Sequence, residues 1–335
     1  MIKRLLCLTA LILLLCAGCD RPQEPPVNRQ FMAMDTFMSL TAYGPRAEAA
    51  LAAIEAETAA LEKRISVTVP GSELARLNSG ERVPLSPTVH DLLAQSLAMC
   101  ARTGGLMDIS LYPVVSAWGF TQGTYTVPDS ATLAPLLERV DYRAVDLSGD
   151  ALALRAGMML DLGSTAKGFM GDRAAGILSE YGVGSAILDF GGDVRAVGTK
   201  PDGSPWKVAI VDPRNPGALL GAVELTDGAI VTSGGYERFF EQDGEIYWHI
   251  LDPRTGAPAR SGLLSVSVIG GSGMLCDGLS TALFVMGREA ALAHRAEHRD
   301  FELVLVTDGG EVVITASLEG RFTLISKDYT LVVAP

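Results

Sequence analysis

The chain has 335 residues, of which 48% are hydrophobic and 20% charged, with a formal net charge of -12. This composition is enough for a large core and, at about 150 residues per domain, predicts one or two domains. The acidic balance argues against nucleic acid as a partner, because phosphate backbones are bound by clusters of Lys and Arg. A nucleotide ligand, which needs only a few local donors, is not excluded.

Residues 1–19 (MIKRLLCLTALILLLCAGC) have the pattern of a bacterial lipoprotein signal. Lys3 and Arg4 precede an apolar run that is too short to span a bilayer as a helix. The run ends in Leu-Cys-Ala-Gly-Cys, which resembles a lipobox cleaved before Cys19. Lipidation of Cys19 would anchor the protein to a membrane surface. The alternative is an ordinary signal peptide with a chance Cys.

The signal divides the chain into three expected parts: a lipoprotein signal peptide over 1–18, a lipidated Cys with a flexible Pro-rich tether over 19–30, and one folded domain over 31–335. Asp20 follows the Cys and resembles a signal for retention at the inner membrane of Gram-negative bacteria. We therefore expect the protein at the periplasmic face of the inner membrane.

Only two cysteines, Cys100 and Cys276, remain in the expected domain. Each lies in an apolar run, so one disulfide and two buried thiols both stay open. The His and Cys residues show no zinc-site spacing.

The predicted elements mix helices with short strands and follow no regular βαβ rhythm, which favours an α+β fold of mainly antiparallel sheets with interleaved helices. In the first half we expect a strand at 31–43, a helix at 46–64, turns at 66–80, a helix at 86–102, an irregular stretch at 106–120, a short helix at 130–139 and a hairpin at 143–160. In the second half we expect a helix at 164–181, short strands at 185–190, 194–197, 206–211, 220–225 and 229–232, a strand pair within 237–251, a strand at 263–269, a helix at 275–286 and a hairpin around 308–310.

The segment 160–173 (LDLGSTAKGFMGDR) is the strongest local signal for a ligand site. A strand is expected to break at Gly163 and pass into a helix, whose free N–H groups attract anions. Asp161 lies just before the turn and Lys167 lies in the first helical turn. The cation suits a phosphate, although a surface ion pair at a strand–helix joint is an equally good interpretation of this segment alone.

Three further segments carry polar residues beyond the needs of packing. The first, 188–193 (LDFGGD), ends a strand in two glycines and a carboxylate, although a tight turn explains it as well. The second, 247–256, contains His249, the best acid/base candidate among four histidines. In the third, 274–287, Asp277 and Thr281 are one helical turn apart. A carboxylate and a hydroxyl on one face are ligands that Mg²⁺ accepts, although helix capping also explains Asp277.

These segments together resemble the ApbE family of FAD:protein FMN transferases, and the resemblance covers about residues 31–330. The segments that carry it, in family order, are MDT at 34–36, MDISLYPVVSAWGF at 107–120, LDLGSTAKGF at 160–169, LDFGGDVRAVG at 188–198, TSGGYERFF at 232–240, HILDPRTG at 249–256 and DGLSTA at 277–282.

The resemblance implies an ApbE-like fold and a specific set of site residues. The implied flavin-binding residues are Met34, Met107, Asp108, Asp161, Lys167, His249 and Ile250. The implied Mg²⁺ ligands are the Ser164 carbonyl, Asp277 and Thr281. His249 and Asp277 are the implied catalytic residues.

The activity implied is Mg²⁺-dependent transfer of FMN from FAD to a Thr or Ser hydroxyl of a partner protein, with release of AMP. The implied partners are FAD and acceptor proteins of membrane redox complexes of the Rnf or sodium-pumping quinone oxidoreductase type. Thr68 departs from the larger residue that many relatives carry in a loop associated with the balance between transfer and hydrolysis. An FAD pyrophosphatase that releases FMN and AMP therefore stays open, as does a non-catalytic flavin-binding lipoprotein.

Overall fold

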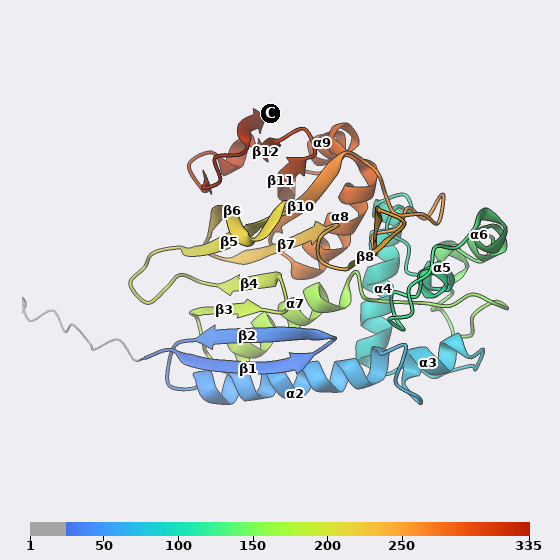
Figure 1. Ribbon diagram of the computed structural model, residues 1–335. Helices are drawn as coiled ribbons and strands as arrows, with labels where there is room; N and C mark the ends of the chain where they lie inside the picture. Colours follow the sequence, from blue (N-terminus) through green and yellow to red (C-terminus); the bar gives the residue numbers. More distant parts are fainter. Residues whose placement is uncertain (1–24) are drawn as a thin grey trace, which may run out of the picture.

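The computed structural model describes residues 25–335. The predicted signal peptide and Cys19 lie outside the described residues. At the centre is one nine-stranded sheet (Figure 1). In spatial order its strands are β1 (Val27–Ala33), β2 (Thr36–Ala42), β3 (Ala186–Asp189), β4 (Asp193–Val197), β7 (Gly228–Gly234), β10 (Leu263–Gly270), β11 (Phe301–Thr307), β12 (Glu311–Thr315) and β14 (Thr330–Ala334). Neighbouring strands are antiparallel except β12 and β14, which are parallel.

Helices cover one face of this sheet. They are α2 (Ala47–Ile65), α4 (Pro87–Arg102), α7 (Ala166–Glu180), α8 (Gly273–Met286) and α9 (Arg288–Glu297). Helix α2 lies along β1 at one end of the sheet, and α7 and α8 pack together against its middle strands (Figure 1). Most buried apolar residues of the protein lie between this face and the helices.

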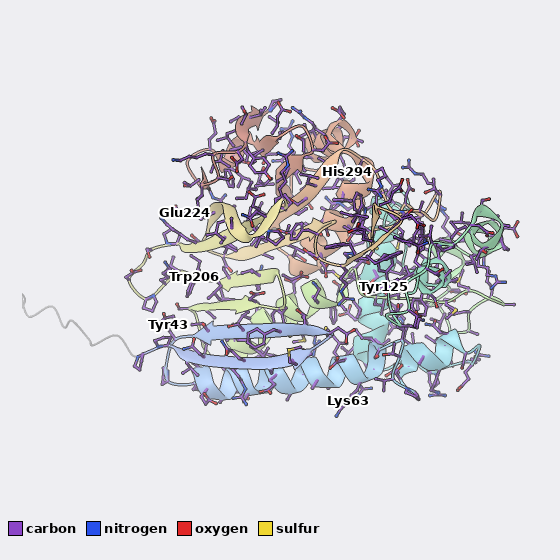
Figure 2. The ribbon with its side chains drawn as sticks, in the orientation of Figure 1. Tyr43, Lys63, Tyr125, Trp206, Glu224 and His294 are labelled. Atoms are coloured by element: carbon purple, nitrogen blue, oxygen red, sulfur yellow. The ribbon has the colours of Figure 1, made fainter. Side chains whose placement is uncertain are left out.

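A second, smaller sheet covers part of the opposite face. Its strands are β5 (Trp206–Asp212), β6 (Asn215–Leu225) and β13 (Phe322–Leu324). Because successive strand residues point to opposite faces, Leu303 and Leu305 of β11 pack toward the helices while Val304 packs toward the small sheet. At the edge of this layer the rings of Tyr43 and Trp206 lie 6.3 Å apart, and both residues are labelled in Figure 2.

An aromatic lobe projects beside the main sheet (Figure 1). It contains α5 (Tyr112–Trp118), α6 (Ser130–Leu137) and the hairpin of β8 (Phe239–Gln242) and β9 (Glu245–Trp248). Tyr125, labelled in Figure 2, stacks on Phe240 with ring centroids 5.0 Å apart. The Trp118 indole N–H donates to the Gly256 carbonyl at 2.7 Å and ties the lobe to the segment that follows His249.

The single strand predicted at 31–43 is wrong: the segment is the β1–β2 hairpin. Its two turn residues, Met34 and Asp35, both have left-handed backbones, with φ of 51° and 57°. A two-residue hairpin turn of this kind needs positive φ at both positions and is usually signalled by Asn-Gly or Asp-Gly. Met-Asp gives no such signal, so the sequence reads as one uninterrupted strand.

The hairpin predicted at 143–160 is also wrong. Its two halves do not pair with each other; the second half instead forms single bridges to distant residues, Leu152 to Val83 and Met159 to Leu111. The short 3-10 helix η1 (Tyr142–Ala144) begins the segment. The predicted elements also lacked α3 (Glu73–Asn78) within the predicted turns, α5 within the predicted irregular stretch, and α9. Another 3-10 helix, η2 (Ala316–Leu318), follows β12.

The predicted α+β class is confirmed, and the remaining predicted helices and strands are present within a few residues of their expected bounds. Cys100 and Cys276 are buried free thiols. Of the two possibilities left open by the sequence, a disulfide and two buried thiols, the structure therefore has the second. No helix within residues 25–335 is long and apolar enough to cross a membrane.

Candidate active site

The turn before α7 forms one side of the predicted site and is held by neighbouring segments. The Asn78 side chain donates to the Leu160 carbonyl at 2.8 Å and accepts from the Leu160 N–H at 2.7 Å. The Asp161 carboxylate accepts from the Gly163 N–H at 2.8 Å, which closes the turn. Helix α7 then begins after Thr165, its N-cap residue. The predicted junction therefore exists, with a hydrogen-bonded turn in place of a regular strand.

Helices α7 and α8 cross at two glycines. A Cβ atom on Gly168 would lie 2.3 Å from the Gly273 carbonyl oxygen and 2.7 Å from the Asp277 Cβ. A Cβ atom on Gly273 would lie 2.5 Å from the Gly168 carbonyl oxygen. Only residues without side chains permit this approach. The crossing brings the first turns of both helices, with their free N–H groups, next to each other.

Asp277 and Thr281 lie one turn apart on α8, as predicted. Because α8 begins at Gly273 after the N-cap Ser272, Asp277 is in the second turn and does not cap its own helix. Its Oδ2 atom accepts instead from the Gly168 N–H of α7 at 2.9 Å. In a longer α7 that N–H would donate to the Ser164 carbonyl. Within residues 25–335, the Ser164 carbonyl receives no backbone hydrogen bond.

A charge cluster surrounds this carboxylate. Lys167 Nζ and Asp193 Oδ1 form an ion pair at 2.8 Å, while the second oxygen of the buried Asp193 has no hydrogen-bond partner within residues 25–335. Burial raises the pKa of Asp277 well above its ordinary range, and the negative charge of Asp193 raises it further. Burial lowers the pKa of Lys167, but the charges of Asp193 and Asp277 outweigh burial and raise it overall. Two carboxylates thus share one cation, which favours binding of a further cation.

His249 follows β9 and is held by the chain next to β8. Its Nδ1 atom lies 3.2 Å from the Arg238 carbonyl oxygen, and its backbone N–H donates to the same oxygen at 3.0 Å. Because a carbonyl only accepts, this contact assigns the proton of the neutral ring to Nδ1 and leaves the Nε2 lone pair free. Burial lowers the pKa of His249 to about 4, and the charges of Arg238 and Lys167 act in the same direction. The ring is therefore neutral at pH 7 and able to accept a proton.

Met107 and Asp108, two of the predicted flavin residues, lie beside the turn before α7, since the Asp161 N–H donates to the Ile109 carbonyl at 2.9 Å. Met107 is buried. The Asp108 carboxylate accepts from the N–H and the hydroxyl of Ser110 at 2.8 and 2.6 Å. Asp108 thus already has local partners that fix the start of α5.

Met34 and Ile250 are placed by different elements. The Met34 N–H donates to Glu62 of α2 at 2.7 Å. The hairpin that carries Met34 contacts the 188–193 loop, because a Cβ atom on Gly191 would lie 2.2 Å from the Thr36 hydroxyl oxygen. Ile250 is buried in the main core directly after His249.

Sequence reasoning did not assign a role to three residues at the end of β7 and between β7 and β8. The Ser233 hydroxyl lies 3.4 Å from the Thr281 hydroxyl. Arg238 positions His249, as described above. Although solvent reaches the Glu237 side chain, the surrounding protein excludes enough water to raise its pKa to about 7, against the opposing charge of Lys167. The signal for this segment was the family resemblance of TSGGYERFF at 232–240, which named none of these three residues.

The predicted Mg²⁺ ligands fit a hard divalent cation. No group of three or more His, Cys, Asp or Glu side chains within residues 25–335 is placed to hold a metal, so a metal here depends on other oxygen ligands. The free Ser164 carbonyl, the Asp277 carboxylate and the Thr281 hydroxyl are such ligands. Mg²⁺ is bound by one or two carboxylates, with waters and substrate phosphates completing the octahedron. The unpartnered oxygen of Asp193 adds negative charge beside them.

The chain is similar to known proteins over most of its length. Residues 34–305 match the sequence pattern of the ApbE family. An FAD:protein FMN transferase from Treponema pallidum is 31% identical over 94% of this chain and 93% of its own length. Another from Vibrio cholerae is 31% identical over 89% of this chain and 92% of its own. The crystal structure of the ApbE protein from Thermotoga maritima superposes with a TM-score of 0.83 at 29% identity, over 89% of this chain and 99% of that one.

Proposed function

The chain belongs to the ApbE family, and from this premise we infer that it is an FAD:protein FMN transferase. We propose that it moves FMN from FAD to a Thr or Ser hydroxyl of an acceptor protein and releases AMP. The observation that carries the assignment of the site is the hydrogen bond from the Gly168 N–H to Asp277. It brings Asp277 and Thr281 of α8 to the start of α7, where the Ser164 carbonyl and Lys167 lie.

The pyrophosphate of FAD would bind at the start of α7. Free N–H groups and the positive end of a helix favour phosphate, and Lys167 adds a full charge. We propose the Ser164 carbonyl, Asp277 and Thr281 as the ligands of a Mg²⁺ ion. When bound, this ion would neutralise the charge that develops on the phosphate oxygens during transfer. Met34, Met107, Asp108, Asp161 and Ile250 remain the proposed contacts to the rest of the flavin nucleotide.

His249 supplies the proton acceptor for the reaction. Its free Nε2 atom takes the proton of the acceptor hydroxyl, whose oxygen forms a bond to the FMN-side phosphorus. The bond from this phosphorus to the bridging oxygen breaks, and its electron pair leaves with AMP. The negative charge of bound FAD would raise the low pKa of His249 toward neutrality and make the ring a better base.

The direct test is to incubate the purified protein with FAD, Mg²⁺ and a flavoprotein acceptor that carries an exposed Thr, then measure the acceptor mass. The proposal expects a mass gain of one FMN, release of one AMP per acceptor, and loss of both with EDTA. AMP release without any acceptor modification would instead assign an FAD pyrophosphatase. Neither product, with FAD still bound, would assign a flavin-binding protein without catalysis.

The location of the protein is a separate proposal. We propose that Cys19 carries lipid, that the Pro-rich segment between Cys19 and the start of β1 at Val27 is a tether, and that the domain works at the periplasmic face of the inner membrane. This position would give access to acceptors in membrane redox complexes of the Rnf or sodium-pumping quinone oxidoreductase type. Labelling cells with a radioactive fatty acid tests the anchor, since Cys19→Ser should remove both the label and the membrane association.

A further inference from the structure

Two carboxylates join α7 and α8 in a reciprocal arrangement. Asp172 lies four residues after the crossing glycine Gly168, and Asp277 lies four residues after the crossing glycine Gly273. Each binds N–H groups in the first turn of the other helix. Asp277 accepts from the Gly168 N–H at 2.9 Å, and Asp172 accepts from the Gly273 N–H at 2.7 Å and the Met274 N–H at 3.0 Å.

The bonds of Asp172 do more than complete the N-terminus of α8. The hydroxyl of Ser272 already caps this helix by accepting from the Leu275 N–H at 3.2 Å. The same hydroxyl donates to Asp172 at 2.6 Å, so Asp172 receives three hydrogen bonds from one turn of α8. Because the acceptor belongs to α7, these bonds fix the position of α8 relative to α7. Hydrogen bonds to a charged acceptor are about twice as strong as neutral ones.

The relative position of these helices matters because the proposed metal ligands are divided between them. The Ser164 carbonyl lies at the start of α7, whereas Asp277 and Thr281 lie on α8. We propose that Asp172 is the positioning residue of the metal site, which holds the α8 ligands at the distance from the Ser164 carbonyl that a Mg²⁺ ion needs. This inference rests on the proposed function, since it assumes that the ion binds there.

The experiment measures Mg²⁺ binding by the whole protein, independently of activity. The probe is Mg²⁺ alone, titrated while the melting temperature is followed, with isothermal titration calorimetry as a second readout. The variants are Asp172→Ala, which removes all three bonds, and Asp172→Asn, which keeps one acceptor oxygen. We expect Asp172→Ala to raise the Mg²⁺ concentration at half effect by about 10- to 100-fold, the usual effect of losing a residue that orients a metal ligand. Asp172→Asn should give a smaller rise.

The matched control is Asp129→Ala, which removes the side-chain cap of α6, where Asp129 accepts from the Thr132 N–H at 2.8 Å. This variant should melt at a lower temperature with an unchanged Mg²⁺ midpoint, which separates general loss of stability from loss of positioning. A midpoint for Asp172→Ala within twofold of the unmodified protein would overturn the inference. If Asp172→Ala does not fold, Ser272→Ala provides the same test, because it removes one of the three hydrogen bonds to Asp172. We expect it to raise the Mg²⁺ midpoint by less than the loss of all three bonds would, and an unchanged midpoint would contradict the inference.

Asp277→Ala distinguishes failure of the inference from failure of the proposed function. If Asp277→Ala loses the Mg²⁺ response and Asp172→Ala keeps it, the metal site stands and the positioning role is wrong. If Asp277→Ala responds to Mg²⁺ as the unmodified protein does, the proposed ligands themselves are wrong, and the role of Asp172 falls with them.

Discussion

Replacing Gly168 by Ala tests the crossing of α7 and α8 on which the site depends. The new methyl group would lie 2.3 Å from the Gly273 carbonyl oxygen and 2.7 Å from the Asp277 Cβ. The first of these contacts is with backbone, so no change of rotamer relieves it and the helices must separate. Such overpacking costs about 1–3 kcal/mol. Weakening the hydrogen bond from the Gly168 N–H to the Asp277 carboxylate adds about 1.5–3 kcal/mol.

Part of this cost is offset, because Ala is favoured over Gly in a helix by about 0.5–1 kcal/mol. We therefore expect Gly168→Ala to lower the free energy of unfolding by about 2–5 kcal/mol, measured by urea denaturation followed by circular dichroism. Gly176→Ala is the matched control on the same helix, since a Cβ atom there meets nothing within 4 Å. The free energy of unfolding of that variant should be higher than that of the unmodified protein by about 0.5–1 kcal/mol. A Gly168→Ala protein as stable as the Gly176→Ala protein would refute the close crossing.

Three further predictions concern the charges of the site. Lys167→Met leaves the buried Asp193 carboxylate without its ion-pair partner at 2.8 Å. We expect this variant to lower the free energy of unfolding, measured by urea denaturation, by about 3–5 kcal/mol, which is more than Asp193→Asn lowers it. Equal decreases for the two variants would contradict a buried ion pair. The pKa of His249 falls from 6.5 to about 4 on folding, so the unfolded chain binds more protons between these values and stability drops as pH falls through this window. The melting temperature of His249→Gln should depend less on pH there, and an unchanged profile would count against the shift. The pKa of Glu237 rises from 4.5 to about 7, so the folded chain binds more protons and stability drops as pH rises through that window. Glu237→Gln should remove this drop, and a profile as steep as before would show that Glu237 does not cause it.

The parts of the site that sequence predicts are those set by local spacing. Asp277 and Thr281 share a helix face because they are four residues apart in a helical pattern. Lys167 lies near the start of α7 because a glycine and N-cap residues mark that start. In both cases the relevant contacts depend on the residues within one or two turns, which a sequence displays directly.

The parts that could not be predicted depend on contacts between distant segments. The Asp172 bonds join residues about 100 positions apart, and the Lys167–Asp193 pair joins residues 26 apart. A single sequence does not say which helices cross, so the hydrogen bonds from Asp172 to α8 and from Asp277 to α7 could not be predicted. The false hairpin at 143–160 has the same origin, because alternating residues show that a segment is extended but not which segment it pairs with.

The most direct test of the account is the position of the metal. Crystals grown with FAD and Mn²⁺, which prefers the same octahedral oxygen ligands as Mg²⁺, would be measured for anomalous scattering from the manganese. We expect a peak bound by the Ser164 carbonyl, the Asp277 carboxylate and the Thr281 hydroxyl, with the pyrophosphate of FAD against it. A peak on other protein ligands, or FAD bound with no peak at these three, would contradict it.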